Sequence, residues 1–379
     1  MRNDDFYIAE REAAEPVLLL EYNGIRLTRP TNYIVRAAKD LGASIVIVDQ
    51  RYTGTSLPTK EFSVGTLKKL LTVPQSVQDV ALTVAALARK YYPLTFDGAI
   101  LSSAPLKFQL EDPEYTKVLG KDFSNRGLGG STQCLSALKE AHSAIGEKLA
   151  SPEGRRQLEK TFNIHEGDLE AREVQTAFTL HGRSTGLVVQ NNDPLCKGEY
   201  CNVEKVCKKL TEGPTPLDML ATIYKARHRG DLAAGVKEYL ARLKDEKIPS
   251  ADRMREFRIC SSRGLISTCN SATCSFFTRS ENSWFDYGTW LCREGFGISK
   301  EDILQGVEEL RKYVGDFRNT TNILSINGDA DPWYPSSIFR EGEGPEVQMV
   351  GNASHCYWCS VDDGTVLERI RNVIQKWLE

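Results

Sequence analysis

The 379-residue sequence has no uninterrupted apolar run long enough to span a bilayer, and it has no large excess of charge of either sign. Its formal net charge is -3, which gives no electrostatic basis for binding nucleic acid or an anionic membrane surface. The N-terminus, Met1–Asp5, is polar, and no basic start followed by an apolar stretch indicates a signal peptide. We therefore expect no nucleic acid and no membrane among the partners.

The composition that is present is that of a globular protein. Hydrophobic residues make up 41% of the chain and charged residues 26%, which excludes a disordered chain. A chain of this length can bury a large core, so we expect one large domain with an insertion, or two domains. The composition leaves the oligomeric state open.

Ten cysteines are present, an even number at close spacing in loop-rich sequence, which favours disulfide bonds and an oxidising compartment over free thiols. Cys134 stands apart, and we expect most pairs to form within Cys196–Cys292. Only Cys356–Cys359 has the C-x-x-C spacing of a zinc-ligand pair, and no second pair accompanies it, so no metal or other cofactor is predicted. Asn319 and Asn352 begin sequons for glycosylation, a short pattern that often occurs by chance.

The N-terminal part of the chain alternates apolar, β-branched runs with segments of helical periodicity. The predicted strands are Val17–Leu20, Ala43–Asp49 and Phe96–Ser103, and the predicted helices are Asn32–Leu41 and Pro74–Lys90. Strands and helices that alternate in this way predict an α/β fold built on a doubly wound parallel sheet.

The middle of the chain is charged and mostly helical, with helical spacing over Asp218–Leu243 and Ser299–Val314. The strand rhythm resumes at Asn322, and the chain closes with a predicted helix, Thr365–Leu378. We therefore predict three segments: residues 1–105 and 318–379 form the two parts of one core, and residues 106–317 form an inserted helical cap domain.

Two titratable residues follow apolar runs near the C-terminus. Thr321–Ile326 leads into Asp331, and Val347–Val350 leads into His355. An Asp and then a His on consecutive strand ends is the order of the last two members of an α/β-hydrolase triad. We predict that these two residues are the catalytic acid and base, within hydrogen-bond reach at the carboxyl edge of the sheet. The other four histidines are expected to be structural or exposed: His142, His165, His181 and His228.

Several segments carry a resemblance to a known family. Val48–Pro58 resembles its E-H-R-Y-Y-G-x-S-x-P turn, Leu70–Ala81 its Y-L-T-x-x-Q-A-x-x-D-x-A helix, and Tyr92–Pro105 its Y-P-x-x-x-x-G-A-x-x-S-S-A-P segment. Asp331–Trp333 and His355 resemble its triad acid and base. The family is that of the serine exopeptidases that include lysosomal Pro-X carboxypeptidase and dipeptidyl peptidase II. The resemblance covers most of both flanks; in the helical middle it rests on placement and on the segment Trp284–Thr289.

This resemblance implies an α/β-hydrolase-like fold with a helical cap, and proteolysis of short peptides that have proline near a terminus. The cleavage would be that of a carboxypeptidase or of a dipeptidyl peptidase. In the mechanism of such enzymes a serine attacks the carbonyl, His355 would move the proton, and Asp331 would orient the imidazole. The resemblance also implies a secreted, lysosomal or vacuolar protein, as does the cysteine content.

The nucleophile of that family has no counterpart where it is expected. The family carries it in G-G-S-Y-x-G, between the segment that ends here at Ala81 and the segment that begins here at Tyr91. Only nine residues separate these two positions, whereas a strand of about five residues, a sharp turn and a helix of about ten are needed. A second departure is Ala9–Glu15, an acidic stretch where the family has a glycine-rich turn for the oxyanion hole.

Four other serines are candidates for a relocated nucleophile, and each has a simpler interpretation. Ser131 follows two glycines but no apolar strand, so it is expected to cap a helix. Ser102 and Ser103 end a strand at the catalytic edge, but they match a motif that does not carry the nucleophile. Ser56 is expected to be a turn residue. The nucleophile is therefore unknown from the sequence.

Two classes of hypothesis remain open. In the first, the chain is a family member that is impaired or inactive, because a segment is missing from the transcript or because the protein is a true pseudoenzyme that retains a peptide-binding cleft. In the second, the chain is an esterase or another hydrolase with a relocated nucleophile. The sequence does not distinguish carboxy-terminal from amino-terminal cleavage.

Overall fold

The computed structural model describes residues 17–22, 33–49, 52, 56–73, 83–181, 184–228, 230–248, 250–269, 271–272, 274–276, 278, 284–359, 361 and 363–379. Several predictions fall partly or wholly outside these residues. They include the acidic turn Ala9–Glu15, parts of the segments Val48–Pro58 and Leu70–Ala81, and the first half of the predicted helix Pro74–Lys90, of which the structure describes the end as α4 (Thr83–Tyr91).

The first two strands form a parallel pair, as their β-branched sequences predict. β1 (Val17–Tyr22) pairs with β2 (Ser44–Asp49) in a register that sets Val17 opposite Ser44, and α1 (Tyr33–Leu41) connects them. Parallel strands need a crossover connection, and a helix is its usual form. Within the described residues, neither strand is hydrogen-bonded to another sheet.

A second parallel sheet has the order β3-β6-β7. It consists of β3 (Ala99–Ser102), β6 (Ile323–Gly328) and β7 (Glu346–Val350). All six residues of the central strand β6 are buried, which fits its apolar sequence and its position between two neighbours. The two strands predicted near the C-terminus are thereby confirmed, and they are adjacent.

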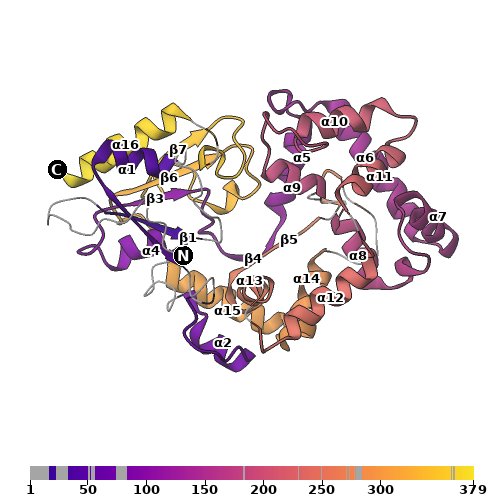
Figure 1. The fold of residues 1–379 in the computed structure, drawn as a ribbon, viewed down its shortest axis with the longest axis horizontal. Helices are drawn as coiled ribbons and strands as arrows, with labels where there is room; N and C mark the ends of the chain where they lie inside the picture. Colours follow the sequence, from indigo (N-terminus) through magenta and orange to yellow (C-terminus); the bar gives the residue numbers. More distant parts are fainter. Residues whose placement is uncertain are drawn as a thin grey trace.

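Helices cover both faces of this second sheet (Figure 1). On one face, α1 and the C-terminal helix α16 (Gly364–Leu378) pack on Leu324 and Ile326. On the other face, α4 and α15 (Lys300–Val314) pack in a cluster that includes Leu101 and Ile323. The predicted helices Ser299–Val314 and Thr365–Leu378 are confirmed to within one residue, and Ser299 caps α15 through a capping box with Asp302.

The middle of the chain is helical, with α2 (Val64–Leu70) preceding it in sequence. Its helices are α5 (Pro113–Ser124), α6 (Thr132–Leu149), α7 (Pro152–Phe162), α8 (Arg172–His181), α9 (Ser184–Gln190), α10 (Val203–Glu212), α11 (Pro216–Arg227), α12 (Leu232–Lys244), α13 (Ala251–Arg258) and α14 (Trp284–Phe296). Helical spacing over Asp218–Leu243 is interrupted between α11 and α12, because Gly230 adopts a φ of 109° and Asp231 begins a new helix as its N-cap.

A short parallel pair, β4 (Gln109–Asp112) and β5 (Gly264–Ser267), lies between the two lobes in Figure 1. One lobe holds the sheets, and the other contains α5–α11 around a separate hydrophobic cluster. Helices α13 to α15 pack instead in the cluster that contains α4 and β3. The domain limits at residues 106 and 317 remain a prediction.

Five disulfides pair all ten cysteines: Cys134–Cys207, Cys196–Cys201, Cys260–Cys292, Cys269–Cys274 and Cys356–Cys359. Three of them lie within Cys196–Cys292, as the spacing predicts. The separation of Cys134 in the sequence is misleading, because α6 and α10 pack together and bring it to Cys207. The pairing fits an oxidising compartment. Among the described helices, none is both long enough and apolar enough to cross a membrane.

Candidate active site

The loops that follow β6 and β7 meet at the carboxyl edge of the sheet. The backbone N–H of Asp329 donates to the carbonyl of Val350 at 3.1 Å. Gly328 ends β6 so close to the second loop that a Cβ there would lie 2.0 Å from the carbonyl oxygen of Ala353. A larger residue would push the two loops apart, so glycine at this position permits the contact on which the site depends.

Asp331 and His355 lie in these two loops and form a hydrogen bond. The distance from His355 Nδ1 to Asp331 Oδ2 is 3.0 Å. Asp331 is fully buried, and its other oxygen accepts the backbone N–H of Trp333 at 2.9 Å. The imidazole is 32% exposed. With Nδ1–H donated to the carboxylate, Nε2 is the nitrogen left to act as a base.

The loop of His355 is held from two other parts of the chain. Its backbone N–H donates to the carbonyl of Gln190 in α9 at 3.0 Å, and the next N–H, of Cys356, donates to Ser103 Oγ at 2.9 Å. The second lobe and the end of β3 thus both position the imidazole. No pattern in the sequence predicts a role for Gln190.

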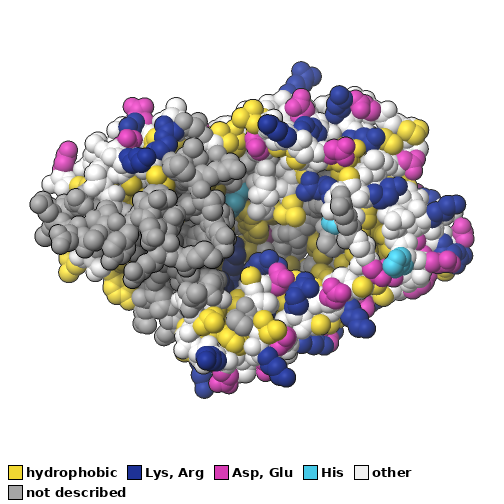
Figure 2. All heavy atoms as spheres, in the orientation of Figure 1, with side chains coloured by type: hydrophobic (Ala, Val, Ile, Leu, Met, Phe, Trp, Pro, Cys, Tyr) yellow, Lys and Arg dark blue, Asp and Glu magenta, His cyan; other side chains and the backbone are white. Residues whose placement is uncertain are grey.

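Trp333 joins the two lobes beside this pair. It packs against the hydrophobic clusters of both lobes, and its ring centroid is 4.7 Å from that of Tyr115 in α5. Its Nε1–H donates to Gln190 Oε1 at 3.1 Å, and the hydroxyl of Tyr115 donates to the same oxygen at 2.9 Å. The surface is hollowed between the two lobes, with hydrophobic and basic side chains in the hollow (Figure 2). We call this depression the interlobe hollow.

None of the candidate serines is hydrogen-bonded to the imidazole in the part of the chain that the structure describes. Ser131 is the N-cap of α6 and accepts the N–H of Cys134 at 3.0 Å, as predicted. Ser102 Oγ accepts Trp358 Nε1–H at 3.1 Å. Ser103 Oγ accepts the N–H of Cys356, the residue after His355, but Ser103 is only 2% exposed.

Two buried carboxyl groups lie on α5 or at its start. Burial raises the pKa of Asp122 to about 8; the charges of Asp329 and Asp331 also raise it, whereas Lys121 lowers it. Both carboxyl oxygens of Asp122 lack a hydrogen-bond partner. Burial likewise raises the pKa of Asp112 to about 6, although hydrogen bonds to its carboxylate act in the opposite direction. Neither acid was foreseen from the sequence.

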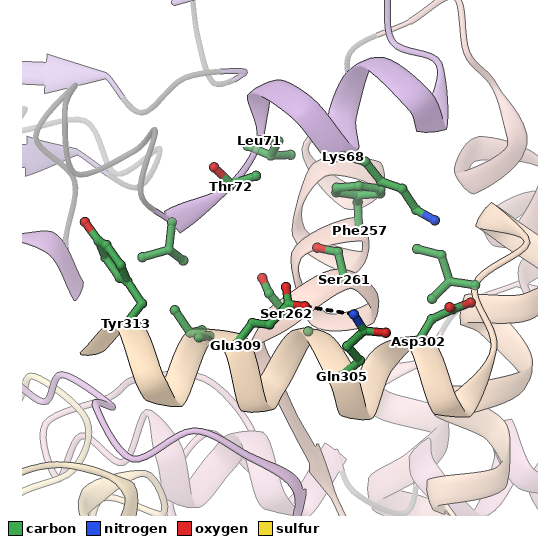
Figure 3. A pocket seen from close by; sticks show the side chains of 14 residues that line it. Lys68, Leu71, Thr72, Phe257, Ser261, Ser262, Asp302, Gln305, Glu309 and Tyr313 are labelled. Atoms are coloured by element: carbon green, nitrogen blue, oxygen red, sulfur yellow. Dashed lines mark hydrogen bonds between the residues drawn. The ribbon is translucent and has the colours of Figure 1, made fainter. Parts of the chain in front are cut away.

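A cavity of about 440 Å³ lies in another part of the molecule. It is lined by α2, α13 and α15, with Phe257, Ser261 and Tyr313 in its wall (Figure 3). Gln305 Nε2 donates to Glu309 Oε1 at 2.8 Å within it. Neither Asp331 nor His355 lines it, so it is separate from the candidate site.

One described group of side chains has the spacing of metal ligands: His165, Asp168 and Asp231, whose ligand atoms lie within 4.8 Å of one another. His165 Nδ1 is 2.7 Å from Asp231 Oδ2, and the other oxygen of Asp231 caps α12 through the N–H of Ala234. The group is explained by the His165–Asp231 hydrogen bond at a capped helix start, and we assign no metal to it.

A carboxylate and an imidazole, hydrogen-bonded at the ends of adjacent parallel strands, have the arrangement of the acid and base of a serine hydrolase site on an α/β-hydrolase-like fold. Comparison with known proteins agrees. The model of the family described as Serine carboxypeptidase S28 matches residues 81–362, so the chain belongs to this family of serine peptidases. The resemblance in the sequence is thereby confirmed.

Individual relatives are distant. The chain is 23% identical to the thymus-specific serine protease of Mus musculus over 83% of this chain and 69% of the relative. It is 25% identical to that of Homo sapiens over 72% of this chain and 55% of the relative. A Caenorhabditis elegans protein named as a serine protease is 24% identical over 98% of this chain and 81% of the relative. That last alignment is 427 positions long, longer than the chain itself, so the relative has residues at positions where this chain has none.

Proposed function

We propose that this chain binds short peptides with proline near a terminus in the interlobe hollow, and that it does not cleave them because it lacks the nucleophile. Its core would be a doubly wound sheet from which the central strand, with the nucleophile turn at its end, has been lost. The parent activity would be that of a proline-directed exopeptidase in a secreted or lysosomal compartment.

The observation that carries the proposal is the division of the sheet. β1 and β2 pair only with each other, and β3, β6 and β7 form a separate sheet, within the described residues. All these strands are parallel to their neighbours, so a further parallel strand between β2 and β3 would complete one continuous sheet. In sequence, such a strand belongs between β2 and β3, where only nine residues lie between Ala81 and Tyr91.

Two features of the comparisons support the same interpretation. The family match begins at Ala81, the point at which the segment is expected to be missing. The alignment with the nematode relative also requires residues that this chain lacks.

Without the serine, Asp331 and His355 would form a general base that has no nucleophile to activate. Asp331 holds Nδ1–H of His355, so Nε2 can accept a hydrogen bond from water or from a ligand. In a complete triad this nitrogen takes the serine proton, and without a serine it has no proton to remove from a nucleophile. Affinity for a peptide does not depend on that step.

The test uses the purified chain with a chromogenic Xaa-Pro dipeptide, a peptide ending in Pro-Xaa, and a serine-reactive phosphonate probe. We expect binding of the peptides, no hydrolysis above background and no labelling. His355→Ala should leave the background rate unchanged. Hydrolysis that His355→Ala abolishes would overturn the proposal. Sequencing transcripts across the codons for Leu82 to Ala88 separates a true pseudoenzyme from an enzyme with a longer transcript.

Ser103 favours a second candidate function, a hydrolase with a relocated nucleophile. It follows β3 with a φ of 52°, the left-handed backbone that a sharp strand-to-helix turn requires of a nucleophile. Its Oγ accepts the N–H of Cys356, beside His355. In this case the phosphonate would label the chain, and Ser103→Ala would abolish the labelling, whereas Ser131→Ala, which changes only a helix cap, would not.

A further inference from the structure

Arg263 occupies an unusual stretch of backbone between the two lobes. It ends a π-helical turn (Ile259–Arg263), and the next two residues, Gly264 and Leu265, have φ values of 58° and 55°. A Cβ on Gly264 would lie 2.4 Å from the carbonyl oxygen of Gln109, so β4 requires glycine there. Positive φ at leucine is a strained state, and strain and π-turns both concentrate at functional sites.

The guanidinium of Arg263 has no salt bridge and no hydrogen bond to the described residues. It lies over the ring of Trp333, 5.8 Å from the ring centroid. Burial lowers the pKa of Arg263, the charge of Arg255 lowers it further, and the charge of Asp112 acts in the opposite direction. Arg263 is partly exposed, so its five N–H donors can reach an acceptor that enters from solvent. The contrast is Arg253, which is fully buried and donates to the carbonyls of Leu243 and Phe62.

Trp333 places this cation beside the candidate site. The N–H of Trp333 donates to the carboxylate of Asp331, which in turn binds His355. Its indole N–H donates to Gln190, and Tyr115 packs against its ring. A ligand between the imidazole and Arg263 would therefore meet an aromatic surface with a cation at its end.

We propose that Arg263 binds the C-terminal carboxylate of a peptide lying in the interlobe hollow against Trp333. The inference rests on the proposed function and adds to it which end of the peptide is recognised. A guanidinium binds a carboxylate through two parallel N–H···O bonds, and few other groups in a short peptide offer that match. A peptide N-terminus is a cation, which Arg263 would repel, so recognition of the carboxyl end is favoured over that of the amino end.

The test measures fluorescence anisotropy of a short peptide ending in Ala-Pro-Phe and labelled at its N-terminus. Three forms are compared: the free acid, the C-terminal amide, and the amide with a glutamate inside the sequence. We expect the acid to bind about 10-fold to 100-fold more tightly than either amide. Arg263→Met should reduce binding of the acid to that of the amide, and Arg263→Lys should restore part of the difference.

Arg311→Met serves as the control, because Arg311 is exposed on α15 and paired with Glu308. It should leave the preference for the acid unchanged, and thermal unfolding establishes that all the variants are folded. Equal affinity for acid and amide would overturn this inference and leave the proposed function standing. Equal loss of acid and amide in Arg263→Met would show a structural role and also overturn it. Binding of none of the peptides would remove the proposed function and this inference together.

Discussion

The two parts of the core differ in what holds the residues at the ends of their strands. After β6 and β7, Asp331 and His355 are fixed by bonds to each other, to Trp333 and to Gln190 of α9. β1 and β2 pair only with each other among the described residues. The difference teaches that the contact between Asp331 and His355 does not depend on how β1 and β2 pair.

The reason is that the described partners of the pair lie outside the stretch between β2 and β3, where we propose that a segment has been lost. Gly328 sets the distance between the two loops, Ser103 holds the loop of His355 from β3, and Gln190 holds it from the other lobe. These contacts assemble with or without a serine. The geometry of Asp331 and His355 is therefore evidence of family membership and not of turnover.

If the proposed loss of the nucleophile segment is correct, the largest effect is expected from restoring that segment. Insertion between Leu82 and Ala88 of the serine-bearing segment of the mouse thymus-specific serine protease should produce hydrolysis that His355→Ala abolishes. Loss of the nucleophile costs about 10⁶-fold in a well-studied serine protease, so the gain has that upper limit. Initial rates with the chromogenic dipeptide measure it. A folded insertion variant with no activity would show that the C-terminal part of the core is not competent either.

The N-terminal part of the core and the rest of the chain also differ in their disulfides. The first cysteine of the chain is Cys134, so the N-terminal part of the core has none. The Cys134–Cys207 bond closes a loop of 73 residues. Replacing both cysteines by alanine should cost about 4 kcal/mol of unfolding free energy, because the unfolded chain gains freedom. The control is Cys196–Cys201, with a separation of 5, for which about 2 kcal/mol is expected. Denaturant unfolding measures both, and equal losses would contradict the loop-length argument.

Asp331→Ala tests how much the hydrogen bonds of Asp331 contribute to the free energy of unfolding. The substitution removes the acceptor for the N–H of Trp333 and for the imidazole, inside a buried environment. We expect a loss of about 2 kcal/mol. Asp40→Ala is the matched change in the N-terminal part, since Asp40 is exposed and paired with Arg371, and it should cost less than about 1 kcal/mol. Similar losses for the two variants would mean that the Asp331 network contributes little to folding.

The same contrast shows how far the sequence predicts this molecule. The strands and helices with strong periodicity, such as β2, β6 and α15, lie where the pattern predicts them, because a buried strand and an amphipathic helix each require their pattern locally. The order of Asp331 and His355 predicted their contact, because consecutive parallel strands end at one edge. Their catalytic roles remain predictions.

Contacts between the lobes could not be predicted in this way. Gln190, Tyr115 and Arg263 come from three separate segments and meet at Trp333 only because β4 and β5 bring the lobes together. The pairing of Cys134 with Cys207 could not be predicted either, because it depends on how α6 packs on α10. Periodicity reports which face of an element is buried and does not report which distant element covers it.

The last prediction concerns pH and the buried acid Asp122, which lies in the second lobe and whose pKa is raised by burial and also by the charge of Asp331. Burial raises its pKa from 3.8 to about 8, so the folded protein keeps the proton that the unfolded chain releases. The stabilisation from this group is complete below pH 4 and is lost as the pH rises toward 8. The slope is about 1.4 kcal/mol per pH unit for one proton.

His142 changes the unfolding free energy in the opposite direction as the pH changes. Burial lowers its pKa from 6.5 to about 4, so its contribution to stability is lost as the pH falls below 6.5. The two slopes oppose each other at lower pH, and Asp112, with a pKa of about 6, also titrates there. Between pH 6.5 and 8 only Asp122 acts among these three groups. Unfolding free energy measured over that window should fall for the natural chain, remain level for Asp122→Asn, and fall unchanged for His142→Gln. A level profile for the natural chain would mean that Asp122 is ionised in the folded state, and that a cation or a donor near Asp331 compensates it.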